Sequence, residues 1–299
     1  MNFEIPPHAC DCHTHVYANP YRFPLAPDRV YTPEVVEAEE LVAFHKRLGF
    51  ERVVVVHPNT HGTDNSVSLY AMSIYGPNAR GVALIDRRTS DFDIESMTKA
   101  GMRGARINLR MKPGDETDTA AGRTLFQALA EQVRKHPWHI QMFTSLPVIQ
   151  AIVDLVRDCP VPVVFDHFGG LDASLALNQP GFPDLIALVR AGNVYVKISA
   201  AYRSSNQSPD YPDIAPFAKA LIAASPDRIL WGSDWPHPTG VTPPGRRTTD
   251  VTPMKQIDDE ALLNQLAVWE PDPAIRQKIL VDNPARLYGF YSGEKGETQ

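Results

Sequence analysis

The sequence has few cysteines, no block of basic residues and no long apolar run. Three cysteines in 299 residues do not make a disulfide framework, and we interpret Cys10, Cys12 and Cys159 as small buried or partly buried thiols. The net charge is −6, and without a Lys/Arg-rich block nucleic acid is not an expected partner. No run of about 18 apolar residues is present, so we expect no membrane span.

Several recognition motifs are missing as well. There is no G-x-G-x-x-G, no Walker loop and no G-x-S-x-G elbow, so nucleotide-binding and serine-hydrolase classes have no support. The first ten residues contain no basic segment followed by a long apolar stretch, so no signal peptide is expected. Together with the few cysteines, these absences predict a soluble, cytoplasmic protein.

Short apolar runs alternate with segments of helical period along the whole chain. The strand candidates are 8–16, 52–57, 81–85, 104–108, 139–143, 161–166, 194–199 and 229–233. The helix candidates are 33–48, 65–75, 92–100, 120–135, 146–157, 182–190, 213–224, 258–268 and 273–281, the last of which should end before Pro284. Eight β-then-α units predict one closed (β/α)8 TIM barrel, with 1–299 as a single domain.

The run CDCHTH ends the first strand candidate. Alternate residues of a strand point to opposite faces, so Asp11, His13 and His15 should share one face and the two cysteines the other. Two imidazoles on one face can hold one metal ion or one oxyanion. In (β/α)8 barrels the active site lies at the carboxyl ends of the strands, where both histidines fall.

Polar residues follow other strand candidates at the same end. Asp234 lies in WGSDWPHP after the last one, in an apolar setting that suits a base taking a proton from water; a helix-capping role is the alternative. His167, in VVFDHFGG, is the second candidate, with Asp166 as its support. The alternative is a structural histidine whose ring nitrogens are hydrogen-bonded within the core.

Cationic residues accompany these groups. Arg106 lies within the fourth strand candidate and Arg203 follows the seventh. An arginine in such a place needs a carboxylate partner, so the substrate is expected to be anionic, unless protein carboxylates fill that role. Lys112 lies on the loop after the fourth strand. Arg246 and Arg247 are interpreted as solvated loop charges, and whether they reach the site stays open.

Three further polar residues are weaker candidates for ligand contact. Asn59 and His61 follow the second strand candidate, and Tyr31 lies in the loop after the first. The same residue types also suit loops, helix caps and ordinary packing.

The ordered motifs DCHTHVY, RFPLAPDRVYTP, HGTDN, GMRGARIN, VVFDHFGG, WGSDWPHP and NPARLYGF resemble the amidohydrolase superfamily, and within it the 2-pyrone-4,6-dicarboxylate lactonase-like branch. The resemblance implies a hydrolase that opens a small anionic lactone carrying carboxylate. It implies that Asp234 activates water without any metal and that His13, His15 and His167 surround the lactone carbonyl. Arg106, Lys112, Arg203, Tyr31, Asn59 and His61 would hold the rest of the substrate.

Two departures from that pattern bear on specificity. Gly170 stands where the dicarboxylate lactonase has an arginine, and Phe143 where it has a tyrosine. An arginine–carboxylate contact is worth about 1.5–3 kcal/mol. We therefore expect a lactone with fewer or differently placed carboxylates than the pyrone dicarboxylate.

The sequence leaves alternatives open for the metal content and for the reaction class. Superfamily members with two metals use a carboxylated lysine on the fourth strand, which has none here, so no binuclear site is expected. A metal-free site is the preferred interpretation, and a single Zn²⁺ held by His13, His15 and Asp234 stays open. The alternative function is a mononuclear metal-dependent non-oxidative decarboxylase, and the third is a binding protein without turnover. Assembly into a homo-oligomer also stays open.

Overall fold

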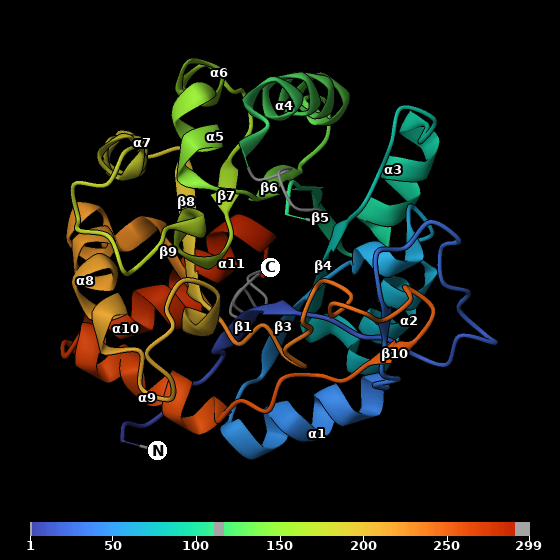
Figure 1. The fold of residues 1–299 in the computed structure, drawn as a ribbon, viewed down its shortest axis with the longest axis horizontal. Coiled ribbons are helices and arrows are strands. Elements are labelled where there is room, and N and C mark those ends of the chain that lie inside the picture. Colours follow the sequence, from blue (N-terminus) through green and yellow to red (C-terminus); the bar gives the residue numbers. More distant parts are fainter. Residues whose placement is uncertain (1, 111–116, 291–299) are drawn as a thin grey trace, which may run out of the picture.

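The computed structural model describes residues 2–110 and 117–290. Eight parallel strands pair in sequence order and helices surround them (Figure 1). The strands are β1 (Cys10–Thr14), β3 (Arg52–Val56), β4 (Ala79–Ala83), β5 (Met102–Asn108), β6 (His139–Phe143), β7 (Val163–Phe165), β8 (Val194–Ser199) and β9 (Ile229–Gly232). All are short and nearly all of their residues are buried, as expected for strands between two packed layers.

The two edges of this sheet meet just beyond β9. The backbone N–H of Asp234 donates to the carbonyl of His13 at 2.9 Å, and the N–H of His15 donates to the carbonyl of Trp235 at 2.8 Å. These bonds join the last strand to the first, which confirms the predicted (β/α)8 barrel. They also bring Asp234 beside His13 of β1 and His15 just after it, although the segments are more than 200 residues apart in the chain.

The outer layer is helical. Its helices are α1 (Ala38–Leu48), α2 (Ser66–Tyr75), α3 (Asp91–Lys99), α4 (Thr119–Val133), α5 (Leu146–Ala151), α6 (Val153–Arg157), α7 (Phe182–Ala191), α8 (Ala215–Ala224), α9 (Asp259–Trp269), α10 (Pro273–Gln277) and α11 (Asn283–Tyr288). The predicted helix 146–157 is broken at Ile152, whose φ of −114° lies outside the helical region. The described residues contain no helix long and apolar enough to cross a membrane.

The predicted end of the last helix is wrong. The chain passes from α10 through a π-helical turn (Lys278–Asp282) into α11, which contains Pro284. Proline is tolerated in the first turn of a helix, because its missing N–H has no helical acceptor there. The side chain of Asn283 anchors this turn by donating to the carbonyls of Pro226 and Ile229, both at 2.8 Å.

The predicted alternation of side chains along β1 is also wrong. A register shift lies between Asp11 and Thr14. Asp11 contacts His45 of α1 at 3.1 Å, whereas Cys10 and Cys12 pack in the barrel interior. A bulge inserts one residue and so resets the faces of a strand. His13 and His15 therefore lie at the mouth of the barrel without Asp11.

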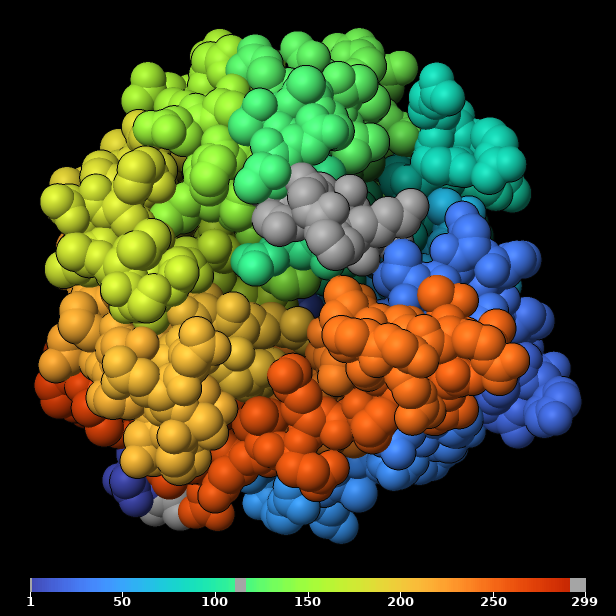
Figure 2. All heavy atoms as spheres, viewed as in Figure 1, coloured from blue at the N-terminus to red at the C-terminus, as the bar shows by residue number. Residues whose placement is uncertain are grey.

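Two loops cover part of that mouth. The short strand β2 (Thr32–Pro33) pairs with β10 (Val251–Thr252). The hydroxyl of Thr32 donates to the carbonyl of Thr248, and that of Thr242 to the carbonyl of Val30, both at 2.7 Å. Figure 2 shows the orange segment around β10 packed beside the blue N-terminal loops. We call these two loops, one around Thr32 and the other around Thr248, the roof.

Candidate active site

A polar pocket lies at the carboxyl ends of the strands, beneath the roof. It encloses about 440 Å³ between atoms, part of it open to solvent. Of the predicted site residues, His15, Tyr31, Asn59, Arg106, His167, Arg203 and Asp234 line it. Asn108, Arg110 and Phe143 complete much of the remaining wall.

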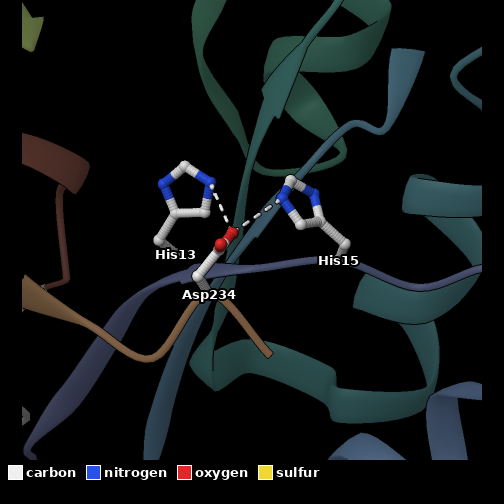
Figure 3. Close-up of side chains that lie close together, drawn as sticks. All are labelled: His13, His15 and Asp234. Carbon is white, nitrogen blue, oxygen red and sulfur yellow. Dashed lines mark ion pairs between the residues drawn. The ribbon is translucent and has the colours of Figure 1, made fainter. Parts of the chain in front are cut away.

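Three imidazoles converge on one carboxylate oxygen. The Nε2 atoms of His13, His15 and His167 lie 3.6, 3.3 and 3.9 Å from Oδ1 of Asp234. Figure 3 shows the rings of His13 and His15 on either side of this carboxylate. Asp234 and His167 both have positive φ, 66° and 50°, which is costly for a non-glycine residue. Such conformations are typical of functional sites, where the surrounding fold imposes them.

The other oxygen of Asp234 is fixed by two donors. Nε of Arg203 donates to Oδ2 at 2.6 Å, and the hydroxyl of Tyr202 donates to the same atom at 2.7 Å. Burial alone would raise the pKa of Asp234, but the guanidinium of Arg203 and the neighbouring histidines lower it well below the usual value. Asp234 is therefore a carboxylate at neutral pH, with Oδ1 directed at the histidines.

The histidines are neutral at the same pH. Burial is the main cause that lowers the pKa of His13 to about 3, and it lowers the pKa values of His15 and His167 as well. Nδ1 of His15 donates to the carbonyl of Val56 at 2.7 Å, which fixes its proton on that nitrogen. Nδ1 of His167 lies 2.8 Å from Oγ of Ser199. The site thus combines neutral imidazoles with one carboxylate.

A second polar group lies directly under His13. Oδ1 of Asp166 is 3.2 Å and Nζ of Lys197 is 3.3 Å from Nδ1 of His13. Gln141 bridges the two, donating to Asp166 at 3.0 Å and accepting from Lys197 at 2.7 Å. Lys197 was missed in the sequence. A lysine inside the apolar run VYVKIS is a usable signal, because a buried ammonium needs partners.

Not every predicted contact residue reaches the pocket. His61 does not line it, and its Nδ1 lies 3.2 Å from the carbonyl of Pro24. His13 has no exposed surface and does not line it either; it contacts the pocket residues Asp234 and His167. Lys112 lies outside the described residues. Arg246 and Arg247 are exposed and pair with Asp250, at 3.8 and 2.9 Å, as expected for solvated loop charges.

The donor set fits one divalent metal ion. One ligand atom each from His13, His15 and Asp234 lies within 4.8 Å of the others, and all three residues are buried. Nε2 of His13 and Oδ1 of Asp234 have no hydrogen-bond partner. Two imidazole nitrogens and a carboxylate oxygen are ordinary ligands of a catalytic zinc.

The chain belongs to the amidohydrolase family, whose model matches residues 10–290. It is 37% identical to a 4-sulfomuconolactone hydrolase of Rhizobium radiobacter, over 97% of this chain and 92% of that protein. It is 34% identical to a 2-pyrone-4,6-dicarboxylate hydrolase of Comamonas testosteroni, over 96% and 92%. A solved apo protein of Agrobacterium tumefaciens has a TM-score of 0.79 at 28% identity, over 95% of this chain and 96% of its own. The family and branch that the motifs resembled are confirmed.

Proposed function

We propose that this chain is a lactonase that opens a small anionic cyclic ester, with Asp234 as the base that activates water. The observation that carries the proposal is the arrangement of Asp234. Its Oδ2 is held by Arg203 and its Oδ1 faces three imidazoles at the edge of the pocket. The relatives named as hydrolases of a muconolactone and of a pyrone dicarboxylate support the substrate class.

The charge of the pocket supports an anionic substrate. Arg106, Arg110 and Arg203 line it, and Asp234 is its one lining carboxylate among the described residues. Arg203 is engaged by Asp234. Nε of Arg106 is buried without a hydrogen-bond partner, and Nη2 lies 3.9 Å from Asp166. A carboxylate on the substrate would satisfy that donor, with Tyr31 and Asn59 as further polar contacts on the same wall.

The chemistry follows from these groups. Oδ1 of Asp234 takes a proton from water while the water oxygen bonds to the lactone carbonyl carbon. An imidazole N–H of His13 or His167 donates to the oxyanion that forms. The bond from that carbon to the ring oxygen then breaks, and the ring oxygen takes the proton from Asp234. The product is an open-chain acid, and Asp234 is a carboxylate again.

We propose that this reaction proceeds without a metal, with a single Zn²⁺ as the alternative. His13, His15 and Asp234 would hold the ion. Its positive charge would lower the pKa of a bound water and polarise the carbonyl.

The test is a hydrolysis screen over sugar-acid lactones and lactones from aromatic degradation, with carboxylates at varied positions. Release of acid is followed with a pH indicator, and release of CO₂ is measured in parallel. We expect acid without CO₂ from at least one lactone carrying carboxylate. Release of CO₂ from a carboxylated substrate, with no lactone opened, would favour the decarboxylase instead. Metal analysis and chelator treatment of the same preparation decide between the two forms, because zinc needed for turnover contradicts the metal-free one.

A further inference from the structure

Lys197 is the one lysine among the described residues that is fully buried, and the reaction proposed above gives it no task. It lies on β8 below the pocket with no exposed surface. Its Nζ is surrounded by three acceptor atoms: Oε1 of Gln141 at 2.7 Å, Nδ1 of His13 at 3.3 Å and Oδ1 of Asp166 at 3.4 Å. A buried ammonium is costly unless it has partners, and here the contacts with Gln141 and His13 have hydrogen-bond geometry while Asp166 supplies the opposite charge.

Nδ1 of His13 has two neighbours that require opposite proton positions. If it donates to Asp166, the proton lies on Nδ1 and Nε2 carries a lone pair. If it accepts from Lys197, the proton lies on Nε2. The contact with Lys197 has hydrogen-bond geometry. Oδ1 of Asp166 is at 3.2 Å but has no hydrogen-bond partner.

We propose that Lys197 is a positioning residue that donates to Nδ1 of His13 and so holds the proton of that ring on Nε2, facing Asp234. The proposal rests on the lactonase function and specifies the part that His13 takes in it. His13 is then a hydrogen-bond donor to the carbonyl oxygen. In this form its Nε2 has no lone pair for a metal ion, so Lys197 weakens the zinc site that the donor set otherwise fits.

The two histidines of the H-x-H pair therefore carry their protons on opposite nitrogens. His15 donates from Nδ1 to the carbonyl of Val56, so its Nε2 is an acceptor 3.3 Å from Oδ1 of Asp234. His13 accepts at Nδ1, so its Nε2 is a donor 3.6 Å from the same oxygen. One ring can hold water and the other can bind the carbonyl oxygen.

The test is the ¹⁵N NMR spectrum of the metal-free wild-type protein labelled at histidine. Resonances are assigned with His13→Gln and His15→Gln. We expect His13 to carry its proton on Nε2 and His15 on Nδ1. A proton on Nδ1 of His13, or on both of its nitrogens, would overturn the proposal. No turnover is measured, so this result is independent of whether the chain opens lactones.

Lys197→Met supplies a second test, with Lys219→Met on the exposed face of α8 as the matched control. Without Lys197, His13 should donate from Nδ1 to Asp166, and its signals should change to that form. Affinity for Zn²⁺ alone, measured by competition with a chromophoric chelator, should rise by about tenfold. Lys219→Met should change neither. Unchanged His13 signals in Lys197→Met contradict the proposal, and if that variant does not fold the wild-type spectrum still decides.

Discussion

Two arginine–aspartate pairs of nearly equal length lie in different parts of this molecule. Arg203 and Asp234 meet at 2.6 Å in the mouth of the barrel, where their side chains are 14% and 0% exposed. Arg123 of α4 and Asp154 of α6 meet at 2.7 Å on the outer helical layer, with exposures of 39% and 62%. In both pairs the arginine lowers the pKa of the aspartate, to about 2 for Asp154.

The difference is in what surrounds the carboxylate. Asp154 meets water, which screens the pair and hydrates either partner when the other is removed. Asp234 is buried, so hydration compensates far less for the loss of Arg203, and its second oxygen faces three imidazoles. A lowered aspartate pKa therefore does not mark a functional site by itself. A stronger indication is a buried, charged carboxylate that lines a pocket and has an oxygen without a hydrogen-bond partner, as Asp234 does.

Among variants that test the comparison of these two pairs, Asp234→Asn should have the largest effect. An amide cannot take a proton from water, so kcat should fall by about 10³-fold or more, within the range for loss of a general base together with its electrostatic contribution. The circular dichroism spectrum should be unchanged. Asp154→Asn is the matched control and should keep full turnover of the same lactone. Comparable turnover in the two variants would refute the role of Asp234.

Arg203→Met should produce the next largest effect. It leaves Asp234 buried without its cation, so the free energy of unfolding should drop by about 3 kcal/mol. The value of kcat/KM should drop about 100-fold, because Oδ1 is no longer aimed by the bond to Oδ2. Urea unfolding and steady-state kinetics measure the two quantities. Wild-type kinetics in this variant would show that Asp234 needs no such alignment.

The third prediction concerns His139 and the dependence of stability on pH. Burial is the main cause that lowers the pKa of His139 to about 3. As the pH falls below about 6.5, the unfolded chain binds this proton and the folded chain does not, so stability is lost. Between pH 6 and 4 this histidine should contribute about 1.4 kcal/mol per pH unit. His139→Leu should reduce the slope of unfolding free energy against pH by that amount, and parallel slopes would contradict the assignment.

Arg123→Met should produce the smallest effect. The exposed aspartate that remains is hydrated, so the urea midpoint and kcat should both stay close to wild type. A loss of stability comparable to that of Arg203→Met would mean that distance, rather than surroundings, determines the strength of these pairs.

Most of the fold could be predicted because its signals are local. Eight short apolar runs separated by helical periods are visible in the sequence, and the rule that barrel chemistry lies at strand ends places His13, His167 and Asp234 together. The bulge in β1 could not be predicted, because it depends on how Asp11 reaches His45. Pro284 was misread, because proline ends a helix in its interior but is accepted in a first turn.

The residues that hold the site side chains in place were harder to predict. One partner of Asp234 is Tyr202, and the sequence around it does not distinguish it from a tyrosine that only packs in the core. Asp166 and His167 both reach His13, although neighbours on a strand face opposite ways, because β7 ends at Phe165 and His167 adopts a positive φ. Such contacts depend on backbone turns that residue types alone do not specify.

The roof has a consequence for how the substrate preference of such a pocket evolves. Its two halves, around Thr32 and Thr248, come from opposite ends of the gene, yet each gives the other its backbone partners. A substitution that reshapes one half disturbs the other. New substrate preferences should therefore arise from paired changes in both segments, and libraries that vary only one of them should yield mostly weakened enzymes.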